Sequence, residues 1–96
     1  MNKELQKIFN IDQKDRRNPL IRNNKILLTK NDQDRKKILE NIIHKGELSS
    51  AKDYYLAAMI FHHGLSIEDS KKAVKFSKIS YELGYKKALS FYATCL

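Results

Sequence analysis

Eight consecutive apolar or aromatic residues, 54–61, occupy the middle of the segment Ala51–Gly64 (AKDYYLAAMIFHHG). A helix that is apolar on every side must also be buried on every side, so this pattern predicts a central helix with other helices packed around it. The polar residues that follow at once are His62 and His63. Successive residues on a helix diverge by about 100°, and therefore only one of these two histidines can face a given pocket.

Apolar residues at helical spacing predict a first helix over residues 2–17. Pro19 ends it, because proline disfavours helical geometry in the residue before it. The apolar side of this helix is expected to consist of Leu5, Ile8, Phe9 and Ile11. Between residues 18 and 30 the pattern is weak and predicts either a short helix or a loop that tucks its apolar side chains against the core. Those side chains are Leu20, Ile21, Ile26, Leu27 and Leu28.

Three S/T-x-x-D segments predict further helix starts, because the hydroxyl accepts a hydrogen bond from the backbone three residues later and the acid reaches back. They span residues 29–32, 50–53 and 66–69. The helices that follow are expected over about 31–45, 51–64 and 66–84, each ended by a glycine, and a last helix is expected from near Tyr85. The residues expected to be buried are Ile38, Leu39, Ile42 and Ile43, then Ala73, Phe76, Ser80 and Leu83, then Ala88, Leu89, Phe91, Tyr92 and Leu96. The predicted fold is all-α, with about five helices in a single domain over residues 1–96.

Nineteen Lys and Arg against eleven Asp and Glu give a net charge of +8, which favours acidic partners, nucleic acid included. The bases are spread along the chain rather than gathered in one tail, so nucleic-acid binding is the lesser alternative. Lys71, Lys75, Lys78 and Glu82 lie out of phase with the apolar residues of their helix. They predict a solvated outer face or, as the less favoured alternative, a phosphate-binding ridge.

Cys95 is the only cysteine, which excludes an intramolecular disulfide framework and a thiolate metal cluster and fits a reducing compartment. The first residues have no apolar core of signal-peptide length, and no segment approaches the roughly 20 apolar residues of a membrane span. We therefore expect a cytoplasmic protein with no membrane association. No cofactor is expected. No metal site is expected either, because adjacent histidines are not the i,i+4 pair that chelates from one helix turn.

The second half of the chain has small residues and glycines at the positions where helices meet or end. These are Ala57, Ala58, Gly64, Asp69, Ala73, Tyr81, Gly84 and Ala88. This layout resembles the tetratricopeptide-like helical hairpins of the Sel subfamily. The resemblance implies a tetratricopeptide-like hairpin in the C-terminal half and binding of a protein or peptide partner through a helical surface.

Nearly the whole chain also resembles a bacterial family without an assigned activity that combines a D-Q-x-D-R element, an N-D pair and a His-His-Gly segment. The matching residues are Asp12, Gln13, Asp15 and Arg16; Asn31, Asp32 and Arg35; and His62, His63 and Gly64. The family pattern favours His63 facing inward and His62 outward. Members of the family usually continue with another Asp-Arg pair and a Gly-Thr-Gln segment, whereas this sequence ends at Thr94-Cys95-Leu96. Either the native chain continues or part of the family's site is missing.

The polar residues of these motifs allow two interpretations. Asp12 with Arg16 and Asp32 with Arg35 could be exposed same-face ion pairs, worth a few tenths of a kcal/mol each. Alternatively, both pairs converge beside His63, where a carboxylate orients the imidazole and an arginine holds an anion. The candidate site is then Asp12, Gln13, Arg16, Asp32, Arg35 and His63. We expect a non-catalytic interaction module, with an enzyme of unknown class as the alternative if these side chains converge.

Overall fold

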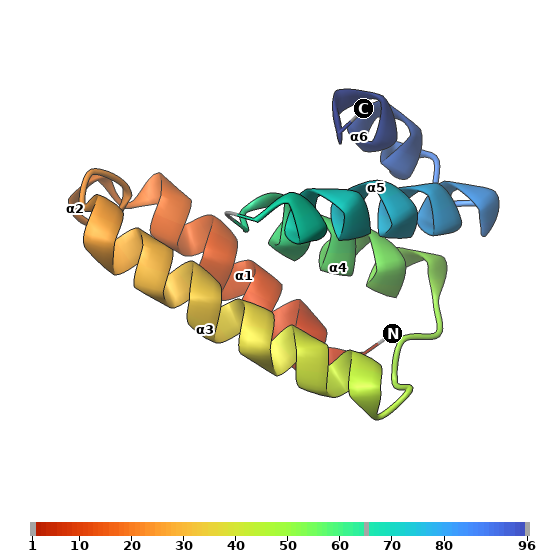
Figure 1. Cartoon of the computed structure of the whole chain (residues 1–96), viewed down its shortest axis with the longest axis horizontal. Coiled ribbons are helices and arrows are strands. Elements are labelled where there is room, and N and C mark those ends of the chain that lie inside the picture. Colours follow the sequence, from red (N-terminus) through yellow and green to blue (C-terminus); the bar gives the residue numbers. More distant parts are fainter. Residues whose placement is uncertain (1, 65, 96) are drawn as a thin grey trace.

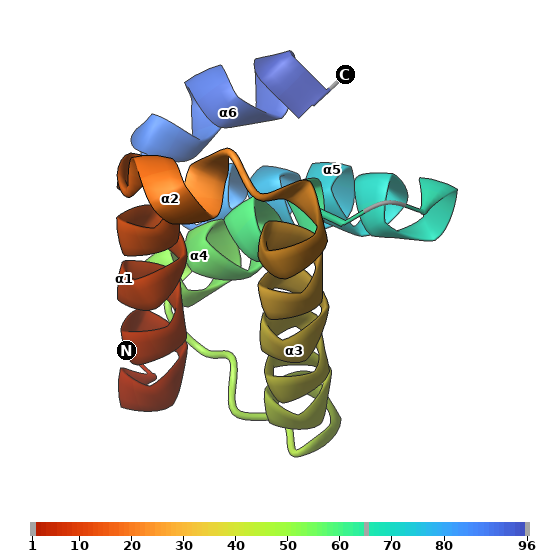
Figure 2. The same ribbon diagram turned by 90° about the vertical axis from the view of Figure 1, so that its left-hand side faces the viewer.

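The computed structural model describes residues 2–64 and 66–95, and this part of the chain contains six helices and no strand. The helices are α1 (Lys3–Arg17), α2 (Pro19–Arg22), α3 (Lys25–His44), α4 (Ala51–His62), α5 (Ile67–Glu82) and α6 (Lys87–Cys95). The predicted all-α class is confirmed. In Figures 1 and 2, α1 and α3 lie side by side and antiparallel, α4 and α5 form a second pair across them, and α6 covers the far side of α5.

Helices α1 and α4 begin beside each other. The side chain of Asn2 accepts a hydrogen bond from the Leu5 amide, and the Asn2 amide donates to Asp53 Oδ1 over 2.8 Å. Asp53 also completes the predicted capping box with Ser50. Its carboxylate thus fixes the starts of two helices that are about 50 residues apart in sequence.

The predicted helix start at Thr29 is wrong. Helix α3 begins at Lys25, where the Asn24 side chain caps it by accepting from the Leu27 amide, and residues 29–32 lie within the helix. Of the two alternatives for residues 18–30, the short helix is found, as α2, and Leu20 and Ile26 do not tuck against the core, since they are 83% and 86% exposed. Because Asp32 does not serve as a cap, its side chain is free to face α1.

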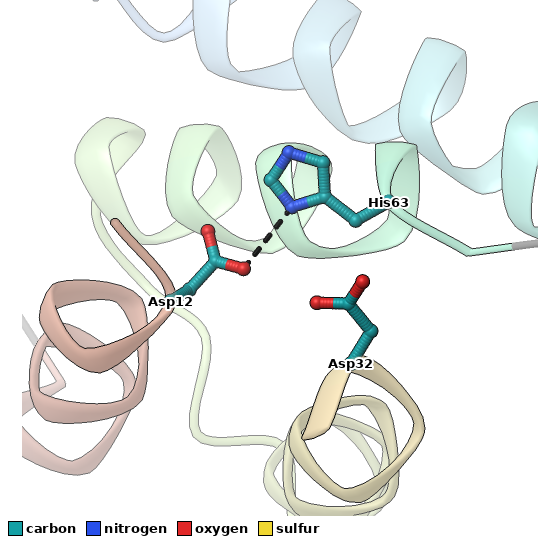
Figure 3. Close-up of side chains that lie close together, drawn as sticks. All are labelled: Asp12, Asp32 and His63. Carbon is teal, nitrogen blue, oxygen red and sulfur yellow. Dashed lines mark hydrogen bonds and ion pairs between the residues drawn. The ribbon is translucent and has the colours of Figure 1, made fainter. Parts of the chain in front are cut away.

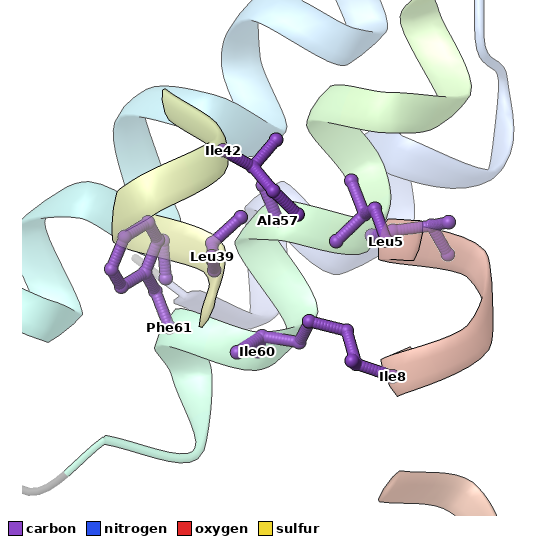
Figure 4. Close-up of a cluster of buried hydrophobic side chains, with 9 residues drawn as sticks. Leu5, Ile8, Leu39, Ile42, Ala57, Ile60 and Phe61 are labelled. Carbon is purple, nitrogen blue, oxygen red and sulfur yellow. The ribbon is translucent and has the colours of Figure 1, made fainter. Parts of the chain in front are cut away.

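The core lies where α1, α3 and α4 meet, and Figure 4 shows its side chains. Its buried members are Leu5, Ile8, Leu39, Ile42, Leu56, Ala57, Ile60, Phe61 and Ala73. Four residues expected to be buried are exposed instead, namely Ile11, Ile38, Leu83 and Leu89. Ile38 shows the reason. It is the residue before the buried Leu39, and the rotation of about 100° between neighbours on a helix places the Ile38 side chain at the edge of the interface.

The remaining helix ends follow the sequence closely. Ser66 caps α5, and Gly46 and Gly84 adopt φ angles of 70° and 104°, which favour glycine, just after α3 and α5. The last helix begins at Lys87, two residues after the predicted Tyr85, and Leu96 lies outside the described residues. The outer residues 71, 75, 78 and 82 of α5 are exposed, as the pattern predicts. None of the helices in the described part of the chain combines the length and the hydropathy that a membrane span requires.

Candidate functional site

The buried face of α1 changes from apolar to acidic halfway along the helix. Its buried residues are Leu5, Ile8, Asp12 and Asp15, at spacings of three, four and three. These spacings keep all four side chains on one side of the helix. One continuous stripe therefore carries two hydrocarbon side chains and then two carboxylates into the interior.

Helix α3 carries the complementary stripe in the opposite direction. Ile42 and Leu39 face the apolar part of α1, and Arg35 faces the acidic part. Arg35 is 6% exposed, and its guanidinium donates to Asp15 Oδ2 and to Asp32 Oδ1, both over 2.7 Å. The antiparallel arrangement of the two helices thus places the arginine of one stripe among the carboxylates of the other.

Asp12 is the centre of the resulting polar cluster and is 1% exposed. Its Oδ1 atom accepts from the guanidinium of Arg16 and lies 3.2 Å from Nδ1 of His63, while Oδ2 accepts from Gln13 over 2.9 Å. Arg16 then reaches Asp32 Oδ2 over 2.8 Å. We use the name polar cluster for Asp12, Gln13, Asp15, Arg16, Asn31, Asp32, Arg35 and His63. Figure 3 shows Asp12, Asp32 and His63 converging from α1, α3 and the end of α4.

The two same-face ion pairs form as expected, Asp12 with Arg16 and Asp32 with Arg35, but they are not exposed, and all six candidate residues lie together. Two further members, Asp15 and Asn31, were absent from the expected site. Asn31 donates to Asp15 Oδ2 over 3.2 Å, and Arg35 binds the same oxygen. The signal for Asp15 was its position three residues after Asp12, which places it on the same face.

Burial alone raises the pKa of Asp12, but the hydrogen bond and charge of His63 and the charge of Arg16 outweigh it and bring the pKa below its ordinary value. Asp12 is thus a carboxylate at neutral pH. Burial alone lowers the pKa of Arg35, and its bonds to Asp15 and Asp32 outweigh this and raise it. Three carboxylates face two guanidinium groups, so the cluster carries one net negative charge while the imidazole is neutral.

His63 occupies the C-cap of α4, where the helix ends beside α1. Its side chain is 17% exposed, and within the described part of the chain its one hydrogen bond is to Asp12. His62 is exposed, and its ring lies edge-on to Phe91 of α6, with 5.2 Å between centroids. The predicted orientation, His63 inward and His62 outward, is confirmed.

The residue after His63 must be small. A Cβ atom at Gly64 would collide with the side chain of Asp69, which binds Lys36 of α3 over 3.0 Å. Asp69 lies at the start of α5, and the backbone amide of Asp69 donates a hydrogen bond to the side chain of Ser66. Gly64 therefore lets the start of α5 approach the end of α4, and this approach fixes the backbone that carries His63.

This geometry also offers ligand atoms for a metal ion. Asp12, Asp32 and His63 each offer one ligand atom, and these atoms lie within 4.8 Å of one another. Both carboxylates already bind Arg16 and lie beside Arg35. A divalent cation would have to displace these guanidinium groups or lie close to their charges, which is unfavourable. The arrangement fits proton transfer better, and the absence of a metal stays a prediction.

No protein-family model matches this chain, and neither the curated proteins nor the solved structures contain a significant match. The function must therefore be argued from the polar cluster and from the surface of the chain.

Proposed function

We propose that the polar cluster is an acid–base site that acts on a small anionic substrate, with His63 as the group that transfers the proton. The observation that carries this proposal is the contact of 3.2 Å between Asp12 Oδ1 and His63 Nδ1. A carboxylate that accepts from Nδ1 holds the imidazole in one orientation and one tautomer. The other ring nitrogen, Nε2, is then left to take a proton from the attacking water, and the protonated ring returns this proton to the leaving alcohol oxygen.

Arg16 is the group proposed to hold the anion. It is the more exposed of the two cluster arginines, at 25% against 7% for the side chain of Arg35. Two of its nitrogens bind Asp12 and Asp32, and a guanidinium has five N–H donors, so donors remain for a ligand. Phosphate and carboxylate groups match this donor geometry. The proposed reaction class is hydrolysis of a phosphate ester.

Hydrolysis of nitrophenyl phosphate and bis(nitrophenyl) phosphate at pH 7 tests this proposal. His63→Gln and Asp12→Asn are expected to lower the rate by about 100-fold or more, the usual contribution of a positioned acid or base. His44→Gln is the matched control, because His44 is exposed at the far end of α3. If the wild type hydrolyses neither ester, or if His63→Gln hydrolyses them at the wild-type rate, the proposal is wrong.

A second candidate is the non-catalytic interaction module, supported by exposed apolar side chains near the α5–α6 turn. Tyr81, Leu83 and Leu89 are each at least 43% exposed, and such groups of residues often mark protein interfaces. Under this proposal, α4 and α5 form a tetratricopeptide-like hairpin in a cytoplasmic protein. Leu83→Glu combined with Leu89→Glu should then abolish binding of a protein partner without unfolding the chain.

Nucleic-acid binding remains the lesser alternative. A nucleic-acid affinity that does not fall as the salt concentration rises would contradict it.

A further inference from the structure

We propose a second binding site, separate from the polar cluster, in a groove between α3 and α5 that receives an acidic peptide with one large apolar side chain. The groove has a volume of about 350 Å³, within the usual range for ligand sites. Ile43 and His44 line it from α3, Lys72, Lys75 and Phe76 from α5, and Phe61 from α4. None of these residues belongs to the polar cluster, so this proposal does not depend on the proposed function.

The floor of the groove is apolar and aromatic. Phe61 and Phe76 stack with 5.6 Å between ring centroids and 17° between planes, and Ile43 is half-buried against the same core. Phe61 itself is fully buried, so it supports the floor from below, and the apolar surface open to a ligand belongs to Phe76 and Ile43. A preformed floor of this kind fits the side chain of a Phe or Leu.

The rim of the groove is cationic on the α5 side. The ammonium group of Lys72 lies 5.2 Å from the centroid of the Phe61 ring, in a cation–π contact. Among the described residues, neither Lys72 nor Lys75 forms an ion pair. Glu40 is the acidic residue of the lining and lies on the opposite wall, on α3. Two lysines without carboxylate partners above an apolar floor favour an acidic ligand with an apolar anchor.

An ion pair joins the two walls about one helical turn before Glu40 and Lys72. Lys36 of α3 binds Asp69 of α5 over 3.0 Å and so ties the two walls together. This ion pair is mostly buried, and its lysine is already neutralised. The available positive charge is therefore limited to the rim beside Phe61 and Phe76. That rim suits the carboxylates that flank a single anchor, whereas a nucleic-acid strand needs a longer basic track with stacking platforms.

The proposal is tested with labelled Glu-Glu-X-Glu-Glu peptides in which X is Phe, Leu or Ala. Each peptide is titrated with the full chain, and binding is measured by fluorescence anisotropy. The Phe and Leu peptides should bind about tenfold more tightly than the Ala peptide, because only they fill the apolar floor. The double variant Lys72→Glu/Lys75→Glu should weaken the Phe peptide by about tenfold or more. Lys78→Glu/Lys86→Glu is the matched control, since both residues are exposed, lie outside the groove and change the net charge equally.

Phe76→Ala gives an independent check, because it enlarges the floor without changing charge and should weaken the Phe peptide but not the Ala peptide. Amide NMR shifts on adding the Phe peptide should map to α3 and α5 around Ile43 and Phe76. Any of four results would overturn the proposal. These are no binding by the wild type, equal binding of all three peptides, equal loss in the control variant, or displacement of the Phe peptide by a single-stranded oligonucleotide at lower concentration.

Discussion

The two ends of the α1–α3 interface use the same helical spacing for opposite chemistry. At one end Leu5 and Ile8 of α1 pack in one hydrophobic core with residues of α3. At the other end Asp12 and Asp15 meet Arg35. The apolar end shows that hydrocarbon side chains suffice to pack this helix pair. Buried ion pairs add little net stability compared with apolar residues of similar size, so stability alone does not explain the ionic end.

The largest effect is expected at Ala58 of α4, the helix that packs across this pair, because Ala58 is fully buried. Ala58→Asp should prevent folding, because it buries an unpaired charge among close-packed helices. Circular dichroism and thermal unfolding would measure this. Ala93→Asp on the exposed part of α6 is the control and should fold. A soluble Ala58→Asp variant that melts cooperatively would contradict the assignment of α4 as the buried helix.

Breaking the ionic end at Arg35 should have the next largest effect. Arg35→Met should lower the free energy of unfolding by about 3–5 kcal/mol, because it leaves buried carboxylates unpaired. These carboxylates would bind protons more readily when folded, so part of the loss should be regained as the pH falls from 7 towards 5. Urea unfolding at both pH values tests this, with Arg22→Met on the exposed side of α2 as the control. A loss that does not depend on pH would show that packing, rather than charge, is responsible.

The apolar end should respond differently. Leu39→Ala removes a fully buried side chain and should cost about 3 kcal/mol, the usual effect of a leucine-sized cavity. Leu39→Ala neither exposes a titrating group nor removes the partner of one, so the loss in free energy of unfolding should be the same at pH 5 and pH 7. The same urea experiment measures it. A pH-dependent loss would mean that the two ends are coupled through the helix pair.

A smaller effect is expected at Asp12, whose pKa is lowered in the folded state despite the opposing effect of burial. A depressed carboxylate pKa stabilises the fold above the ordinary value of about 3.9, and this stabilisation is lost as the pH falls through the folded pKa. Asp12→Asn should therefore cost on the order of 1–3 kcal/mol at pH 7. The stabilities of variant and wild type should converge in acid. Curves that stay parallel down to acid unfolding would contradict the low pKa.

Local signals in the sequence predicted most of the helices correctly. Ser50 with Asp53, and glycines 46 and 84, act through neighbours in the chain, and these predictions succeeded. The start of α3 was missed because both Asn24 and Thr29 are residues that can cap a helix. In the structure the backbone of Asn24 is extended, as an N-cap requires, and the helix therefore begins after Asn24. Burial at Ile11 and Ile38 was overestimated because periodicity does not show how wide an interface is.

The convergence of the polar cluster could not be predicted from local spacing alone. Asp12 and His63 are 51 residues apart in sequence, and their contact depends on how α4 crosses α1. The motifs identified the six residues, but the sequence favoured their interpretation as exposed ion pairs over convergence. The change from Ile8 to Asp12 on one stripe was the available signal, because a stripe that is buried at Leu5 and Ile8 continues into the interior.

The tautomer of neutral His63 tests the central claim most directly. Since Asp12 is a carboxylate, its oxygen can only accept, and the proton must lie on Nδ1. Long-range proton–nitrogen NMR of the ¹⁵N-labelled chain above the titration range of the ring should show His63 protonated at Nδ1 with Nε2 bare. In Asp12→Asn this preference should disappear. A His63 ring that carries its proton on Nε2 in the wild type would contradict the account, because the nitrogen proposed to act as the base would not be available.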